Sequence, residues 1–187
     1  MDPLIPLSRP SRRHASRVIF TPTRRRLACL LASAIVLLSA LAGGLSATAP
    51  AASAASCGTT NVALNKPATA SSTENASSPA SAATDGNTGT RWSSGFSDPQ
   101  WLEVDLGSVR SICGVTLNWE AAYATGFQIQ VSSDNANWTT VYSTTTGTGG
   151  NQTLNVTGSG RYIRMYGTAR ATQYGYSLWE FQAFTTG

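Results

Sequence analysis

Histidine is almost absent from this 187-residue sequence, and cysteine is scarce. The single histidine, His14, lies near the N-terminus, and the chain has only three cysteines. Catalysis by Ser-His-Asp or Cys-His groups needs a histidine base beside the nucleophile, so we exclude it for the chain beyond its N-terminal third. Zinc is disfavoured because its usual Cys and His ligands are missing or paired there. Hydrolysis by two carboxylates stays open, with Glu74 and Glu120 as the pair to consider.

Charged residues are scarce as well, and the basic ones are concentrated at the start of the chain. Seven of the 13 Lys and Arg residues precede residue 27, where Asp2 is the only acid, and the rest of the sequence has six basic and eight acidic residues. The formal net charge of +4 therefore belongs to the N-terminal segment. With Lys66 as the only lysine and no nucleic-acid-binding motif, we do not expect nucleic acid as a partner.

The sequence has no apolar run long enough to favour a membrane span. The longest run, at 27–42, has about 16 residues, against the roughly 20 that cross a bilayer. An Arg-rich start precedes this run and small residues follow it, which is typical of an export signal. We expect residues 1–55 to be signal peptide and small-residue linker, cleaved after Ala54 or Ala55, and the protein to be secreted. A twin-arginine pair in this segment leaves the export route open.

No segment of residues 56–187 has the 3.6-residue periodicity of an amphipathic helix. Apolar and polar residues instead alternate in short runs, separated by turns rich in Gly, Asn, Ser and Thr. These runs lie at 101–106, 115–119, 127–131, 162–166 and 178–184. The length is sufficient for one domain with a buried core. The pattern predicts an all-β fold, an antiparallel β-sandwich.

A turn at residues 84–90, T-D-G-N-T-G-T, combines several oxygen donors. Asp85, Asn87 and Thr90 supply a carboxylate, an amide and a hydroxyl, and two glycines let the backbone turn its carbonyls inward. Calcium takes about 6 to 8 oxygen ligands, many of them backbone carbonyls, so this segment can wrap a hard cation. These residues alone leave open an ordinary Asx turn without a metal.

This turn is one of three separated segments whose ordered combination is specific. The three are N-V-A-L-N-K-P-A-T-A-S-S at 61–72, T-D-G-N-T-G-T-R-W at 84–92 and Y-G-Y-S-L-W-E-F at 174–181. Together they resemble the discoidin or coagulation factor 5/8 type C domain, and more narrowly carbohydrate-binding module family 32. The resemblance covers the chain from about residue 61 to residue 184. It implies a discoidin-like jelly roll of about eight strands over residues 56–187, with a sugar site in loops at one end.

The loops of this region contain the groups with which such modules bind sugars. Aromatic faces stack on sugar rings, and charged groups contact the polar substituents. The expected ligand-binding residues are Glu74, Arg91, Phe96, Glu120, Tyr123, Tyr174 and Tyr176. The glycine between Tyr174 and Tyr176 favours an exposed turn, with core packing as the alternative. For Arg91 the alternative is a salt bridge to a nearby acid.

Two further segments narrow the resemblance. They are N-W-E-A-A-Y at 118–123 and R-Y-I-R-M-Y-G-T-A-R at 161–170, and they are similar to the discoidin-like modules of bacterial chitosanases. This similarity implies recognition of glucosamine oligomers by acidic residues, whose positions Glu74 and Glu120 match. Phe96 stands where we expect Tyr, which keeps the stacking face without the hydroxyl.

The expected function is therefore that of a secreted, non-catalytic module that binds chitosan or its oligomers. A neutral galactoside or β-glucan is the alternative ligand. A membrane- or protein-binding discoidin adhesion domain is less favoured, because basic residues that would meet anionic lipid are few. We expect a monomer.

The resemblance also implies a structural calcium site that joins the early turn to the last strand. Ala82 and Asn87 are expected to contribute carbonyl oxygens, Thr90 its hydroxyl and carbonyl, and Asp85 and Glu180 their carboxylates.

The cysteines beyond the signal segment fit an oxidising compartment. Cys29 lies within that segment, which leaves Cys57 and Cys113 as an even number. We expect these two to form a disulfide, and two unrelated thiols are the alternative.

Overall fold

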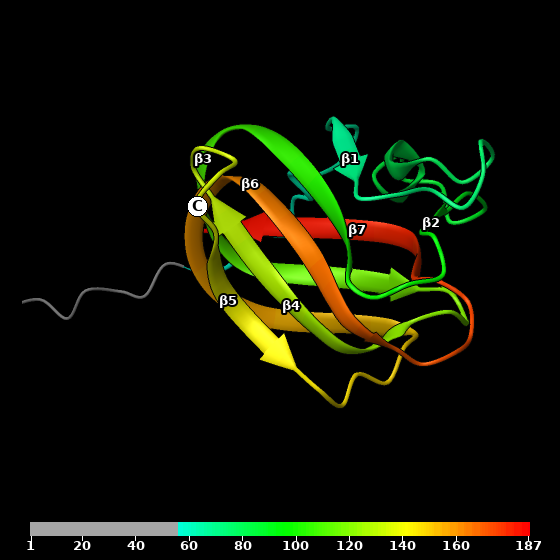
Figure 1. Ribbon diagram of the computed structural model, residues 1–187. Helices are drawn as coiled ribbons and strands as arrows, with labels where there is room; N and C mark the ends of the chain where they lie inside the picture. Colours follow the sequence, from blue (N-terminus) through cyan, green and yellow to red (C-terminus); the bar gives the residue numbers. More distant parts are fainter. Residues whose placement is uncertain (1–55) are drawn as a thin grey trace, which may run out of the picture. The chain divides into compact units, whose positions relative to one another are not determined.

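Seven antiparallel strands form nearly all the regular structure of residues 56–187, the part of the chain that the computed structural model describes (Figure 1). They are β1 (Ala68–Ala70), β2 (Trp92–Ser93), β3 (Gln100–Trp119), β4 (Ala124–Ser132), β5 (Thr139–Thr144), β6 (Asn151–Arg170) and β7 (Ser177–Thr185), with one 3-10 turn, η1 (Ala80–Ala83). The predicted all-β fold is confirmed. The predicted signal peptide and linker at 1–55 lie outside the described residues.

Strands β3 and β6 are long enough to take part in both layers of a sandwich. They pair with each other from Gln100 opposite Gly167 to Asn118 opposite Asn151, and the register shifts between Asp105 and Arg110. The first half of β3 pairs with β1, and the second half pairs with β7. The C-terminal half of β6 pairs with β4, which in turn pairs with β5. Figure 1 shows both long strands curving through the molecule.

The core lies between the two layers because alternate side chains point inward. On paired strands, Leu102 and Val104 of β3 and Ile163 and Met165 of β6 are fully buried. Trp92 of β2 is the largest of the fully buried side chains. Burial of one such aliphatic side chain contributes about 1.5 to 3 kcal/mol, so this alternation is the main source of stability.

The expected disulfide is present and ties the N-terminal end of the described region to the sheet. Cys57 and Cys113 are bonded, with their Cα atoms 5.6 Å apart and a sequence separation of 56. Next to this bond, the Gly58 amide donates to the Thr185 carbonyl oxygen at the end of β7. Closure of a loop of this length stabilises the fold by about 4 kcal/mol on the chain-entropy model.

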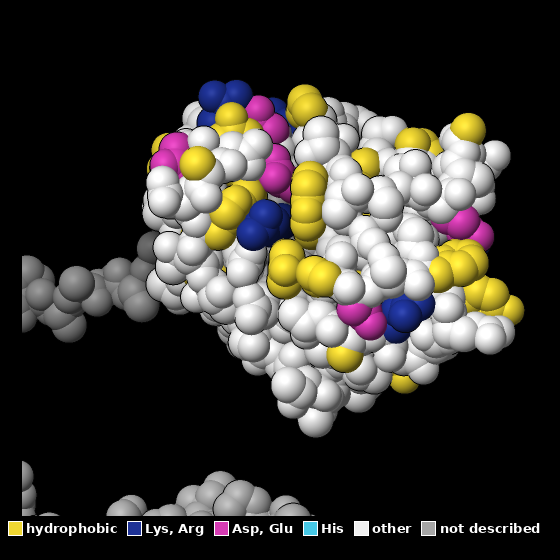
Figure 2. Space-filling model, in the orientation of Figure 1, with side chains coloured by type: hydrophobic (Ala, Val, Ile, Leu, Met, Phe, Trp, Pro, Cys, Tyr) yellow, Lys and Arg dark blue, Asp and Glu magenta, His cyan; other side chains and the backbone are white. Residues whose placement is uncertain are grey.

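Charged side chains are sparse on the surface of residues 56–187. On the face shown in Figure 2, the Lys and Arg side chains lie beside Asp or Glu and do not form a basic patch. No helix in the described part of the chain is long and apolar enough to cross a membrane. The loops at one end of the sandwich carry most of the predicted ligand-binding residues.

Candidate functional site

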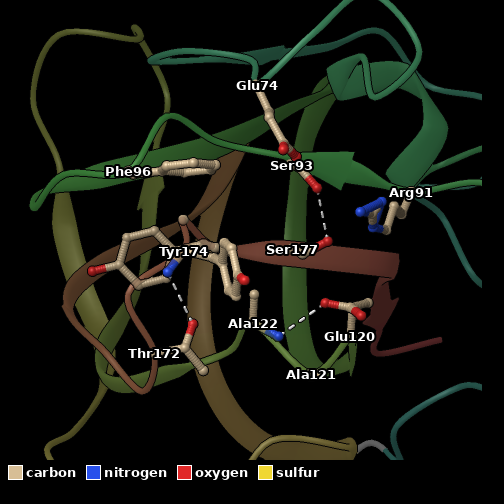
Figure 3. A pocket seen from close by; sticks show the side chains of 12 residues that line it. Glu74, Arg91, Ser93, Phe96, Glu120, Ala121, Ala122, Thr172, Tyr174 and Ser177 are labelled. Atoms are coloured by element: carbon tan, nitrogen blue, oxygen red, sulfur yellow. Dashed lines mark hydrogen bonds between the residues drawn. The ribbon is translucent and has the colours of Figure 1, made fainter.

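A pocket of about 320 Å³ lies between the loops at one end of the sandwich. Its lining includes Glu74 from the loop before η1, Arg91 and Phe96 on either side of β2, Glu120 just after β3, and Tyr174 from the β6–β7 loop. Figure 3 shows the two aromatic rings on one side of the pocket and the charged side chains on the other. The fold thus brings together residues that are far apart in the sequence and that were predicted to bind a ligand.

Phe96 and Tyr174 form the aromatic wall of the pocket. Their side chains are 52% and 54% exposed, and their ring centroids lie 5.8 Å apart in an edge-to-face arrangement with an interplanar angle of 82°. Two large aromatic side chains held together in solvent expose apolar surface at a cost in free energy. Their faces are positioned to pack against the apolar face of a ligand ring.

Tyr176 lines the pocket but is fully buried, so the predicted exposed position is wrong. Its ring packs over Gly167, where a Cβ would lie 2.6 Å from a ring carbon. Its hydroxyl donates to Asp98, and burial together with this bond raises the pKa of Tyr176 far above its usual range. The neighbouring Gly175 does not mark an exposed turn. A Cβ there would lie 2.4 Å from the Ser94 carbonyl oxygen, so glycine allows two loops to meet.

Tyr123 is not among the residues that line the pocket, contrary to the expectation that it contacts the ligand. Its half-buried ring packs against the core and over Gly149. Gly149 has a φ of +70°, and a Cβ at this position would lie 2.6 Å from the ring. The tyrosine therefore closes the edge of the β-sandwich next to the β5–β6 loop.

The two acids in the pocket make no ion pair. The ion pairs within residues 56–187 join Arg161 to Asp105 and Arg170 to Asp98. Glu120 accepts one hydrogen bond from the Ala122 amide at 2.9 Å, which fixes one of its oxygens. Glu74 and Glu120 therefore both retain capacity to accept hydrogen bonds from a ligand.

Arg91 is likewise outside any ion pair of the described residues, so the salt-bridge alternative is not met. Its guanidinium lies 5.8 Å from the centroid of the Trp179 ring. Its Nε is buried and has no hydrogen-bond partner. The pocket thus combines two carboxylates with one unpaired guanidinium.

Small residues complete the pocket and were not predicted. They are Ser93, Ala121, Ala122, Thr172, Gly175 and Ser177. The hydroxyls of Ser93 and Ser177 share a hydrogen bond of 2.9 Å across β2 and β7. These small side chains leave room for a ligand, and the serines and the threonine add hydroxyl groups to the lining. No sequence signal distinguishes them, because Ser, Ala and Thr are frequent throughout the chain.

The turn at residues 84–90 is organised around Asp85. One carboxylate oxygen of Asp85 accepts from the Asn87 amide at 2.8 Å, and the other accepts from the Thr90 hydroxyl at 2.7 Å. Gly86 has a φ of +76°, a conformation that glycine adopts without strain. The oxygen-bearing residues Asp85, Asn87 and Thr90 are therefore held together in one turn, because Asn87 and Thr90 both bond the Asp85 carboxylate. Ala82 lies nearby in sequence, in the buried η1 turn.

Glu180 on β7 places a second carboxylate next to this turn. It is 3% exposed, and both of its oxygens are buried without a hydrogen-bond partner. Burial, and after it the charge of Asp85, raise the pKa of Glu180, which the nearby Gly86 and Asn87 amides only partly offset. An ionised carboxylate left in this way is costly, and a bound cation would remove that cost.

These residues fit a hard cation. Within residues 56–187, no three His, Cys, Asp or Glu side chains gather in one metal-binding group. The donor set would therefore contain two carboxylates and be completed by hydroxyl and backbone oxygens. This composition is typical of calcium and unlike that of zinc.

Residues 67–181 match the F5/8 type C domain. The chain belongs to this family. The match covers β1 to β6, the first five residues of β7, the aromatic wall and all five predicted metal ligands. The prediction of a discoidin-like domain is confirmed.

Among solved structures, this discoidin-like domain is similar to two chitosan-binding modules of a chitosanase/glucanase from Paenibacillus sp. IK-5. Module 1 is 53% identical, with a TM-score of 0.64, over 66% of this chain and 98% of that chain. Module 2, solved in complex with chitotriose, is 50% identical, with a TM-score of 0.65 and the same coverage.

Two further proteins are similar to this chain at lower identity or over a shorter segment. The family 32 module of NanJ from Clostridium perfringens, solved with galactose, is 24% identical with a TM-score of 0.56, over 64% of this chain and 93% of that chain. That similarity shows the fold alone. The polysaccharide lyase 8 family protein HylA from Enterococcus faecalis is 38% identical over 71 residues, which are 38% of this chain and 5% of the length of HylA.

Proposed function

We propose that residues 56–187 form a non-catalytic carbohydrate-binding module that recognises glucosamine-containing polysaccharide, such as chitosan or its oligomers. One observation carries this proposal: a single pocket places Glu74 and Glu120 opposite the exposed rings of Phe96 and Tyr174. Two modules about half identical to this chain are chitosan-binding modules, and one of them was solved with chitotriose.

The chemistry of the pocket suits a cationic sugar. At about pH 6 the amines of chitosan are largely protonated, so they can donate charge-assisted hydrogen bonds to carboxylates. Glu74 is exposed, and Glu120 is half-buried and accepts from the Ala122 amide with one oxygen only. Neither acid has to break an ion pair to bind an amine. Tyr174 and Phe96 offer apolar surface to the ring itself. The carboxylates select the amine, and the aromatic wall selects a pyranose ring.

Arg91 gives the pocket one positive group beside its two acids. Arg91 lines the pocket and lies outside the ion pairs of the described residues, so its guanidinium can donate to a sugar hydroxyl or ring oxygen. A protonated amine would be repelled at that position. We therefore place the amine next to the carboxylates and a hydroxyl-bearing edge of the sugar next to Arg91.

The proposal is tested by titration of the protein with chitotriose and with its fully N-acetylated counterpart. N-acetylation removes the positive charge, so each lost charge-assisted hydrogen bond weakens binding by roughly 10- to 150-fold. We expect chitotriose to bind at least tenfold more tightly in calorimetry at about pH 6. Equal affinity for the two trimers would contradict a glucosamine-specific site. Incubation with chitosan should release no shorter products.

We also propose that a structural calcium ion joins the 84–90 turn to β7. The buried, unpartnered carboxylate of Glu180 beside Asp85 supports this proposal. Ala82, Asn87 and Thr90 would contribute the remaining protein oxygens. When bound, the ion would neutralise the two carboxylates and tie an early turn to the last strand, so its binding free energy adds to folding stability.

We also propose that the protein is secreted, because a polymer such as chitosan lies outside the cell. The apolar run and small residues within 1–55 support secretion. The disulfide between Cys57 and Cys113 agrees with an oxidising compartment.

A further inference from the structure

An ion pair lies behind the aromatic wall without lining the pocket. Arg170, the last residue of β6, donates from Nε to one carboxylate oxygen of Asp98 at 3.3 Å. The same guanidinium donates to the carbonyl oxygens of Gln173 and Tyr174, at 3.1 and 3.2 Å. Arg170 therefore holds the backbone of the β6–β7 loop at the residue that carries one wall ring.

The other oxygen of the same carboxylate fixes the second loop. It accepts the hydrogen bond of the buried Tyr176 hydroxyl, and Asp98 lies two residues after Phe96. The two loops also meet at Ser94, whose amide donates to the Tyr176 carbonyl oxygen at 2.9 Å and whose hydroxyl accepts from the Tyr176 amide at 2.8 Å. The segment carrying Phe96 is thus held at both of its ends.

We propose that Asp98 and Arg170 are positioning residues that hold Phe96 and Tyr174 in their edge-to-face arrangement before the ligand arrives. This inference rests on the proposed function and deepens it, because it names what prepares the pocket for a sugar. Neither side chain lines the pocket. Their side chains are 33% and 22% exposed, so the pair is partly shielded from solvent. The ion pair alone, being partly exposed, adds little to stability, and together with its bonds to Tyr176 and the two carbonyls it orders two loops.

The expected effect on binding follows from loop ordering. When the aromatic wall is already ordered, binding does not incur the entropy cost of ordering two side chains and their loops. Arg170→Gln keeps a polar side chain but cannot bond Asp98 and two carbonyls together. We expect it to weaken chitotriose binding by roughly tenfold, mainly through faster dissociation.

Arg161→Gln is the matched control. Arg161 forms a shorter, two-point pair with Asp105, at 2.8 and 2.7 Å, and neither residue lines the pocket. The control removes an equal charge from the surface, so it corrects for the general effect of charge on a cationic ligand. It should leave the affinity within twofold of the parent.

A double-mutant cycle separates positioning from general loss of structure. In a background that lacks both rings, Phe96→Ala with Tyr174→Ala, the wall no longer exists. There, Arg170→Gln should change the weak binding of chitotriose, followed by NMR at high trimer concentration, by less than twofold. A loss as large as in the parent background would overturn the proposal.

A second readout needs no ligand. Amide hydrogen exchange at residues 171–175 should become faster in Arg170→Gln and stay unchanged in Arg161→Gln, with thermal unfolding of both variants recorded alongside. Unchanged exchange at these residues would overturn the positioning role of Asp98 and Arg170 even if chitotriose binds. If the parent fails to bind chitotriose while exchange responds as expected, the proposed ligand is wrong, but the positioning role of Asp98 and Arg170 is supported.

Discussion

Asp85→Ala should lower the thermal midpoint of the calcium-loaded protein by roughly 10 to 25 °C. The change removes one proposed ligand and leaves the buried carboxylate of Glu180 without its ion. Removal of one partner from a buried charged site costs about 3 to 5 kcal/mol. For a domain of this size each kcal/mol shifts Tm by roughly 3 to 5 °C. Differential scanning calorimetry with excess calcium, and again with a chelator, measures both states.

Two control variants make this experiment specific. Asp134 also organises an exposed turn, through the Ala136 and Asn137 amides, but it is not among the proposed calcium ligands. Asp134→Ala should therefore keep the full response to chelator. Glu180→Gln should lose the response, and in chelator it should be more stable than the parent, because an unpaired buried charge is gone. A parent shown to contain calcium whose Tm does not fall on chelation would refute the structural role of the ion.

Glu120→Gln should weaken chitotriose binding by roughly 10- to 150-fold, the range of a lost charge-assisted hydrogen bond. Glutamine keeps the shape of the side chain and an oxygen that can accept from the Ala122 amide, so the loop geometry is retained. Any binding of the N-acetylated trimer should change by less than threefold, since that sugar offers no positive charge. Isothermal titration of both trimers gives the two affinities.

Asp134→Asn is the charge-matched control for this variant. It removes one negative charge from an exposed turn that does not line the pocket. Its affinity for chitotriose should equal that of the parent at moderate salt. A silent Glu120→Gln would remove the basis for selecting the amine and leave an unselective sugar site.

Local patterns in the sequence predicted the strand segments well. Alternation identified segments such as 101–106 and 115–119, which both lie in β3. Gly107 and Gly114 both lie between those two segments, so one continuous strand has the sequence pattern of two. The resemblance implies about eight strands, and residues 56–187 have seven, among them the long strands β3 and β6 of 20 residues each.

The pocket residues were predictable where the chemistry depends on side-chain type. Glu74, Glu120, Phe96 and Tyr174 carry groups that sugars need, and the fold brings them together. Burial was harder to predict. Tyr174 and Tyr176 flank the same glycine, yet one is 54% exposed and the other is fully buried.

That difference depends on contacts between distant segments. Gly175 meets Ser94, and Tyr176 reaches Asp98. The bond between Asp98 and Arg170 spans 72 residues, and neither residue stands in a motif that points to the other. Such contacts are set by how the loops pack, which periodicity and residue type do not encode.

A crystal structure of the protein with chitotriose would show directly whether the sugar occupies the pocket between the two acids and the aromatic wall. We expect a sugar ring against Phe96 and Tyr174, with its amine nitrogen about 2.7 to 2.9 Å from a carboxylate oxygen of Glu74 or Glu120. A trimer bound elsewhere on the sandwich, or one whose amine points to solvent while only hydroxyls meet the two acids, would contradict it.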